Sequence, residues 1–335
     1  MVPAASLTPA ETATLTRRVT LLSIAVAAIL VAIKFAAWLA SGSTALLASM
    51  ADSGLDLIAS LATGFAVRYA VAPPDAEHRF GHGKAEAFAS LVQAGLVFAS
   101  AALIVREAAD GFLHPHAIQA SGWAIAVMLV SIVLTGGLIA AQSAVLRKAS
   151  SIAVSGDRAH YATDLASNAI ALVGIAAAAW LGLTRFDAAA GVAIAALLLW
   201  GAIGVFREAA NQLMDHELSD EDRAGIVRLA TADGRLANVH QLRTRASGPY
   251  IHIQMHVDLD PEVTLDTAHV AIVAAEKRIL EAFPAADIII HADPRGRAEP
   301  HGGAFAEAAA PKESTLARRP GGEPEATSPD GARSQ

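Results

Sequence analysis

The sequence predicts a membrane protein in two parts, an all-α six-helix transmembrane bundle and a small α+β domain that follows it. Three observations carry this prediction. Of the 335 residues, 54% are hydrophobic and only 17% are charged, which is more apolar than a soluble domain tolerates. The hydrophobic residues gather in six long runs before residue 213. Beyond that point, the composition and the hydrophobic periodicity become those of a soluble domain.

Each run is long enough to cross a bilayer, which takes about 20 mostly apolar residues. The first sixteen residues are small and polar and lack the pattern of a signal peptide, so we expect the first run to be a true span. The expected spans are Arg17 to Ala40, Ser43 to Ala70, Ala85 to Phe112, Gly122 to Leu146, Ser151 to Leu181 and Asp187 to Ala209.

Basic residues predict the orientation of these spans, because Lys and Arg accumulate in cytoplasmic loops. Eight of them flank one end of the spans, and only Arg106 and Arg185 flank the other. An even number of spans puts both termini on one side, so we expect both in the cytoplasm. Lys34 lies within the first span, where it is expected to reach the interface or to pair with a carboxylate. The eight flanking residues are Arg17, Arg18, Arg68, Arg79, Lys84, Arg147, Lys148 and Arg207.

Asp52 and Asp56 lie inside the second run, although a carboxylate in hydrocarbon costs at least a few kcal/mol unless it is paired. Their spacing puts both on one face of a helix. His160 and Asp164 repeat this spacing in the fifth run. Together the four residues offer three carboxylates and one imidazole, a set that suits a divalent ion such as zinc. The alternative is that they only hydrogen-bond within the bundle.

Further polar residues extend both faces, so the second and fifth helices are expected to face each other or a wet cavity. Because the chain contains no cysteine, a metal ion between them must be held by oxygen and imidazole ligands. The stripe on the second helix is Ser49, Asp52, Ser53, Asp56 and Ser60, and the stripe on the fifth is Asp157, His160, Tyr161, Asp164 and Asn168.

The loop between the second and third spans holds another candidate group. Asp75, His78 and His82 fall within eight residues, among glycines that let the backbone fold tightly around an ion. A short loop of this composition is also common as a solvated turn.

The segment after Asp215 predicts a helix, two strands, a helix and a strand, the order of a ferredoxin-like (αββαβ) open-faced sandwich. Apolar residues alternate with polar ones along 250–259, as expected for a strand with one buried face. From Arg295 onward the chain is rich in Pro, Gly, Ala and charge without periodicity, and we expect disorder there. The expected helices are 220–231 and 265–283, and the expected strands are 238–246, 250–259 and 287–291.

Six candidate ligands lie in this domain, which is more than solubility requires. Several fall on polar strand faces or at strand ends, where they could converge on a metal ion, and exposed histidines on a sheet are the alternative. The net charge of −7 gives no reason to expect nucleic acid as a partner. The six residues are His240, His252, His256, His269, His291 and Asp293.

On these residues, the sequence resembles the cation diffusion facilitator (CDF) family of metal/proton antiporters, in its bacterial zinc and ferrous-iron efflux branch. The resemblance extends from about Arg17 to Pro294. It implies a charge pair, Lys84 with Asp215, that interlocks the two domains near a dimer axis, and it offers no counterpart for His252. It also implies a transport site (Asp52, Asp56, His160 and Asp164), a loop site (Asp75, His78 and His82) and a cytoplasmic binuclear site (His240, His256, His269, His291 and Asp293).

The resemblance further implies a Y-shaped homodimer in the lipid bilayer of the bacterial inner (plasma) membrane, which exports Zn²⁺ by alternating between inward-open and outward-open forms. Protons are the implied counter-ion, Cd²⁺ and Fe²⁺ are further candidate substrates, and zinc at the cytoplasmic site is structural or regulatory. No enzymatic reaction is implied. The implied domains are a cytoplasmic N-terminal segment (1–16), the six-helix transmembrane domain (17–212), a cytoplasmic metal-binding domain (213–294) and a disordered tail (295–335).

Other functions fit the residues less well. A membrane metallohydrolase needs an open coordination position with a base and oxyanion donors beside it, whereas four protein ligands fill a tetrahedral zinc. A channel favours weak, multiple sites along a pore. A membrane metal sensor or regulatory protein, which binds but does not transport metal, explains the histidines of the second domain but not the four residues within the spans.

Overall fold

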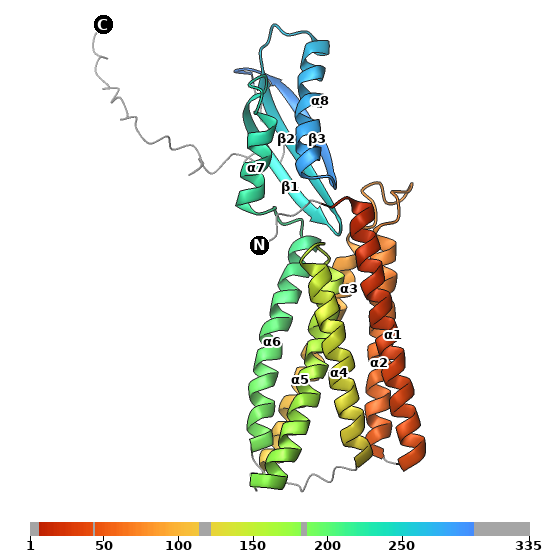
Figure 1. The fold of residues 1–335 in the computed structure, drawn as a ribbon. Helices are drawn as coiled ribbons and strands as arrows, with labels where there is room; N and C mark the ends of the chain where they lie inside the picture. Colours follow the sequence, from red (N-terminus) through yellow and green to blue (C-terminus); the bar gives the residue numbers. More distant parts are fainter. Residues whose placement is uncertain (1–6, 43, 114–121, 182–185, 298–335) are drawn as a thin grey trace, which may run out of the picture.

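The structure is a computed structural model, and it describes residues 7–42, 44–113, 122–181 and 186–297. Within these ranges, six long helices form a bundle, and a sheet with two further helices stands at one end of it (Figure 1). The predicted combination of a six-helix bundle and an α+β domain is confirmed. The bundle helices are α1 (Pro9–Ser41), α2 (Thr44–Ala70), α3 (Ala85–Leu113), α4 (Gly122–Leu146), α5 (Ile152–Leu181) and α6 (Phe186–Leu213).

Helix α5 contacts each of the other five helices of the bundle. Of the remaining contacts, the most extensive join α1 to α2 and α3 to α6. Because α5 is covered from several sides, its polar residues face protein rather than lipid.

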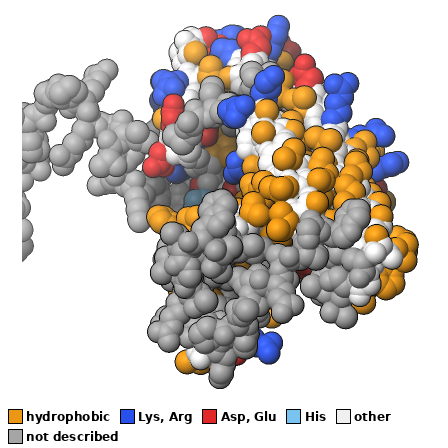
Figure 2. All heavy atoms as spheres, turned by 60° about the horizontal axis from the view of Figure 1, so that its bottom comes forward, with side chains coloured by type: hydrophobic (Ala, Val, Ile, Leu, Met, Phe, Trp, Pro, Cys, Tyr) orange, Lys and Arg blue, Asp and Glu red, His pale blue; other side chains and the backbone are white. Residues whose placement is uncertain are grey.

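The outer surface of the bundle is apolar. Figure 2 shows hydrophobic side chains over its flank and charged side chains toward the top of the view. Large side chains such as Leu55, Phe65 and Trp200 are more than half exposed, which suits contact with lipid rather than water. Among the described residues, α1, α2, α3 and α4 each contain a stretch long and apolar enough to cross a membrane. Helices α5 and α6 contain side chains that the structure does not describe. The chain is a multi-pass membrane protein.

Helix α1 begins earlier than the expected span. Its first residue is Pro9, so the predicted N-terminal segment 1–16 contains the first two turns of the helix. The hydroxyl of Thr8 accepts a hydrogen bond from the backbone N–H of Glu11, and the Glu11 carboxylate accepts one from the backbone N–H of Thr8 at 2.9 Å. This reciprocal cap, with proline in the first turn, starts a helix in polar sequence, where hydrophobicity carries no signal.

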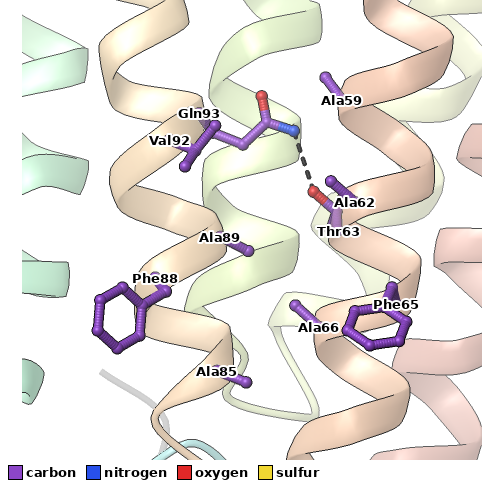
Figure 3. A pocket seen from close by; sticks show the side chains of 10 residues that line it. All are labelled: Ala59, Ala62, Thr63, Phe65, Ala66, Ala85, Phe88, Ala89, Val92 and Gln93. Atoms are coloured by element: carbon purple, nitrogen blue, oxygen red, sulfur yellow. Dashed lines mark hydrogen bonds between the residues drawn. The ribbon is translucent and has the colours of Figure 1, made fainter.

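A cleft of about 300 Å³ lies between α2 and α3. Figure 3 shows that small side chains of both helices line it, with Phe65 and Phe88 beside them. At one end, the side-chain N–H of Gln93 donates a hydrogen bond to the hydroxyl of Thr63 at 3.0 Å, which joins the two helices. The small residues are Ala59, Ala62, Ala66, Ala85 and Ala89.

The second domain has the predicted order of elements. Strand β1 pairs antiparallel with β2, and β3 pairs parallel with β2 on its other side. The predicted tail, 295–335, lies outside the described residues beyond position 297. The elements are α7 (Asp220–Ala230), β1 (Ala237–Ser247), β2 (Tyr250–Leu259), α8 (Leu265–Ala282) and β3 (Ala286–Pro294).

The predicted alternation along β2 divides its two faces. Ile253, Met255 and Val257 are fully buried in the core of this domain. Figure 1 shows α7 and α8 beside the sheet. His256 lies between Met255 and Val257 and therefore faces away from that core. Its partners in the sheet are His240 on β1 and His291 on β3. The hydrophobic core thus leaves one sheet face free for polar side chains.

The loop before α3 lies against the turn between β1 and β2, and this contact joins the two domains. A Cβ atom added to Gly83 would collide with the backbone carbonyl of Ser247. Gly248, in the turn, has a φ of +58°, the left-handed region that favours glycine. Only glycines permit the two backbones to approach this closely.

We expect Gly83→Ala to lower the stability of the protein in detergent by about 1–3 kcal/mol, because the added methyl group must push the loop off the turn. Thermal unfolding of the purified variant measures this. Gly95→Ala on α3 is the matched control, since its methyl group would meet nothing within 4 Å. A Gly83→Ala protein that unfolds at the wild-type temperature would contradict the close approach.

Candidate metal-binding groups

The first group lies between α2 and α5, inside the bundle. The carboxylate of Asp56 is 2.9 Å from Nε2 of His160, and the carboxylate of Asp164 is 3.9 Å from the same nitrogen. Asp56 and His160 are buried. One ligand atom from each of the three residues lies within 4.8 Å of the others, which places all three within reach of one ion.

Asp52, the fourth residue of the predicted set, lies outside this group and is exposed. Four residues advance an α-helix by about 6 Å and rotate it about 40° beyond a full turn. The carboxylate of Asp52 is therefore offset both along α2 and around it, away from His160. The sequence predicted the shared face of α2 but not this offset.

Lys34 is buried on α1 and points toward α2. Its ammonium group donates hydrogen bonds to the hydroxyl of Ser53 at 2.6 Å and to the backbone carbonyl of Ser49 at 3.2 Å. Lys34 is therefore buried among the helices and not at the interface, and it lies near the carboxylates of the predicted set, Asp52, Asp56 and Asp164. Lys34 joins α1 to the face of α2 that carries Asp52 and Asp56.

The loop group is assembled as predicted. The two carboxylate oxygens of Asp75 lie 3.3 Å from Nδ1 of His78 and 3.2 Å from Nε2 of His82. His82 is buried, whereas Asp75 and His78 are exposed. The backbone N–H groups of His78 and Glu77 donate to Asp75, and these bonds hold the pKa of its carboxyl below the usual range. The carboxylate is thus kept in the ionised form that a metal ion requires.

The group in the second domain forms around Asp293 on β3. One oxygen of Asp293 is 3.1 Å from Nε2 of His240 and 2.9 Å from Nδ1 of His256, and the other is 3.4 Å from Nε2 of His291. Burial disfavours the ionised carboxyl, but the hydrogen bond from His256 and the nearby histidines outweigh it and hold the pKa of Asp293 below the usual range. Four of the five predicted ligands therefore converge.

His269, the fifth predicted ligand, lies on the exposed face of α8, outside this group. Sequence analysis missed Asp258, which is buried on β2 beside the group. One of its oxygens accepts a hydrogen bond from the Asn238 side chain at 2.9 Å, and the other lies 3.9 Å from Nδ1 of His240. Its place on the polar face of the predicted strand was the signal that could have found it.

Two irregularities in β1 aim His240 at the group. The pairing of β1 with β2 shifts register on both sides of His240, and Asn238 and Gln241 have positive φ angles of 47° and 49°. Bulges of this kind redirect single side chains near functional sites. Positive φ angles at two non-glycine residues are strained, and such strain is typical of positions where a side chain must be held in one place.

The predicted charge pair between the domains is present and has a third member. Nζ of Lys84 lies 2.9 Å from one oxygen of Asp215, and the guanidinium group of Arg245 on β1 lies 3.1 Å from the other. Partial burial opposes ionisation of Asp215, but the hydrogen bond from Lys84 and the charge of Arg245 outweigh it and hold the pKa of Asp215 below the usual range.

His252, which had no predicted role, belongs to the same junction. Its Nδ1 atom is 3.2 Å from the carboxylate of Asp287, and its ring packs edge-on against Phe80 of the loop before α3. The guanidinium group of Arg245 lies 4.8 Å from the centre of the Phe80 ring. Burial lowers the pKa of His252, and the hydrogen bond with Asp287 offsets this lowering only in part. The neutral imidazole packs as an apolar ring that holds the loop.

Each of the three groups combines carboxylate oxygen with imidazole nitrogen, the ligands of a borderline divalent ion such as zinc. Their surroundings differ, since one group lies among apolar helices and the other two lie in the loop and the second domain. The group inside the bundle is suited to an ion that has lost its hydration shell. The other two groups are suited to ions that exchange with solvent.

Two family models match successive parts of the chain. A family model described as the cation efflux transmembrane domain matches residues 20–214, and one described as the cytoplasmic domain of cation efflux proteins matches residues 218–295. The chain is 38% identical over 280 residues to the cation-efflux pump FieF of Klebsiella pneumoniae, which covers 84% of this chain and 93% of that protein. It is 37% identical over 282 residues to the FieF of Serratia proteamaculans, covering 84% and 94%. A solved structure of the putative zinc transporter CzrB, in its zinc form, aligns at 27% identity with 25% of this chain and 98% of that chain, with a TM-score of 0.24.

We expect Asp215→Asn to destabilise the protein by about 0.5–1 kcal/mol, the range of a partly exposed ion pair. Because the pKa of Asp215 is lowered in the folded protein, its contribution is fully present above the ordinary aspartate pKa of about 4 and is lost as the pH falls through the lower folded-state value. The difference from wild type should therefore be constant between pH 8 and about 5 and shrink below about 4. Unfolding measured over this pH range tests the sign, and Glu281→Gln, on the exposed face of α8, is the charge-matched control.

Proposed function

The chain belongs to the cation efflux family, and from this membership we propose that it exports Zn²⁺ from the cytoplasm in exchange for protons. The family is one of transporters rather than enzymes, and the proposal requires no covalent chemistry. The single observation that carries it is the group of Asp56, His160 and Asp164 buried between α2 and α5. A divalent ion held there lies inside the part of the chain that crosses the membrane.

Asp52 completes the transport site in this proposal. It lies one turn from Asp56 on the same helix, on the face to which Lys34 is bonded through Ser53. A movement of α2 against α5, both along and around its axis, carries the carboxylate of Asp52 toward His160 and gives zinc four ligands.

Proton coupling follows from the same residues. Without metal, three carboxylates in a site of low dielectric constant cannot all remain ionised, so protons occupy part of the site. Zinc binds only the deprotonated ligands and expels those protons, and protonation from the other side of the membrane expels zinc. Competition for one set of ligands, combined with alternating access, is antiport. Cd²⁺ and Fe²⁺ are further substrates that such ligands accept.

The proposal also covers the oligomeric state, the orientation in the membrane and the second domain. We infer a homodimer in the bacterial inner membrane, with both termini in the cytoplasm and with residues 213–294 as a cytoplasmic metal-binding domain. Zinc held by His240, His256, His291 and Asp293 stabilises or regulates that domain. The exposed position of His269 means that its participation requires a second ion or a facing protomer.

A membrane metal sensor is the other candidate, because the loop group and the Asp293 group also suit a protein that only binds metal. The buried group favours transport, since a sensor gains nothing from a site within the membrane. Proton-driven zinc flux into vesicles reconstituted with the purified protein distinguishes the two. A sensor binds zinc in this experiment and moves none.

We expect Asp56→Ala and Asp164→Ala each to lower zinc flux by at least about 100-fold while the protein remains assembled, since even the loss of a residue that only supports a ligand costs 10–100-fold. Flux in vesicles and gel filtration in detergent measure the two properties. Ser131→Ala, which changes a buried hydroxyl of α4 outside the group, is the control and should transport normally. Near-normal flux in either aspartate variant would remove the buried group from the mechanism.

We expect His160→Asp to shift the preference of the transporter from zinc toward harder ions such as Mn²⁺, because the site then contains only oxygen ligands. Competition between metals in the flux experiment gives the order of preference. If that order is the same as in the wild type, His160 is not a ligand of the transported ion.

A further inference from the structure

The bundle holds a second polar cluster, next to the metal group, that metal binding does not use. Its centre is Asp157 on α5, which is 1% exposed. One carboxylate oxygen accepts a hydrogen bond from Nε2 of Gln142 on α4 at 2.9 Å. The other accepts bonds from Nε2 of Gln93 on α3 at 3.3 Å and from the hydroxyl of Ser60 on α2 at 3.4 Å.

Helix α1 joins the cluster through Ser23. The Nε2 atom of Gln142 also donates to the hydroxyl of Ser23 at 3.2 Å, and the hydroxyl of Tyr161 donates to the Ser23 carbonyl at 3.4 Å. The hydroxyls of Tyr161 and Ser60 share a hydrogen bond of 2.8 Å. Side chains from α1 to α5 thus meet at one point, and none is more than 2% exposed. The Asp157 cluster consists of Ser23, Ser60, Gln93, Gln142, Asp157 and Tyr161.

The cluster joins the same two helices as the metal group, one turn away. Ser60 follows Asp56 by four residues on α2, and Asp157 precedes His160 by three residues on α5. These separations correspond to about 6 Å and 4.5 Å along the helix axes. A helix is stiff over one turn, so the contacts of Ser60 with Asp157 and Tyr161 set the register at which His160 meets Asp56.

Both amides of the cluster, those of Gln93 and Gln142, direct an N–H group at Asp157. Among the described residues, the side-chain carbonyl oxygens of Gln93 and Gln142 have no hydrogen-bond partner, because both amides turn their N–H groups to the carboxylate. Buried donors that lose their acceptor are costly, so an apolar residue at 157 forces these side chains to move. The nearest response available is a shift of α5.

We propose that Asp157 is a positioning residue for the transport site: the Asp157 cluster holds α5 in register with α2, so that His160 and Asp164 face Asp56. Its effect on zinc transport rests on the proposed function, whereas its effect on the α2–α5 register does not. In this proposal, the hydrogen bonds of the cluster position α5, and the negative charge does not need to lie on α5 itself. A carboxylate that itself bound metal or carried protons would have to stay at position 157.

Asp157 on α5 and Gln142 on α4 can exchange their carboxylate and amide groups. This exchange distinguishes a positioning role of Asp157 from a role in binding metal or protons. Gln142→Glu places two carboxylates against each other with no donor between them, and we expect it to raise the zinc concentration for half-maximal flux by about tenfold or more, with a smaller change in the maximal rate. The double variant Asp157→Asn with Gln142→Glu restores one acceptor and one amide, and it should return that concentration to within about threefold of the wild type. Ser131→Ala is again the control.

The register is measured independently of transport. The chain contains no cysteine, so spin labels attached at Leu55→Cys on α2 and Val173→Cys on α5, both at exposed positions, report on these helices alone. In the metal-free protein, we expect Gln142→Glu to shift or broaden the distance distribution and the double variant to restore it. If the single variant does not fold, a folded double variant with wild-type distances supports the proposal equally.

Three results would overturn the proposal. The first is a double variant no better than Gln142→Glu in both readouts, which would mean that the charge must remain at 157. The second is Asp157→Leu with an unchanged half-maximal zinc concentration and unchanged distances. The third is a double variant that fails to fold. If the wild-type protein moved no zinc, the proposed function would fall, and the distances alone would decide the role of Asp157.

Discussion

Ionisable side chains are buried among apolar helices, and this burial accounts for how the bundle is arranged. Asp56, Asp157 and His160 are each less than one-tenth exposed, and a charge in such a place needs partners. The bundle provides them by gathering its polar residues where α2 meets α5. This explains why α5 touches every other helix of the bundle while the outward surfaces of the bundle remain apolar.

The polar layer has two levels with different chemistry. At one level, Nδ1 of His160 and one carboxylate oxygen of Asp164 are buried without a hydrogen-bond partner among the described residues, which leaves ligand atoms available to an ion. At the next, amide and hydroxyl donors satisfy a carboxylate within the protein. In the proposed function, the group that binds and releases an ion therefore lies beside a cluster of satisfied hydrogen bonds, which is suited to hold it in position.

The junction between the two domains gathers several contacts around one short loop. Lys84 pairs with Asp215, Phe80 lies between Arg245 and His252, and Gly83 touches the turn of the sheet. The same loop carries the Asp75 group. The candidate metal group at Asp75 thus lies on a segment that also contacts the second domain.

The hydrophobic runs predict the bundle, and the alternation along β2 predicts a strand of the second domain. The four-residue spacing of Asp56 with Asp52 and of His160 with Asp164 predicts the residue types of the buried candidate metal group. All of these patterns are local in the sequence, whereas the convergence of the predicted residues depends on how the helices and strands pack. The tertiary structure left Asp52 and His269 outside their groups, added Asp258 and Arg245, and centred five helices on Asp157. The reason is physical: spacing places a side chain on a face of its own helix or strand, but whether two faces meet, and at what register, depends on the packing of residues far apart in the chain.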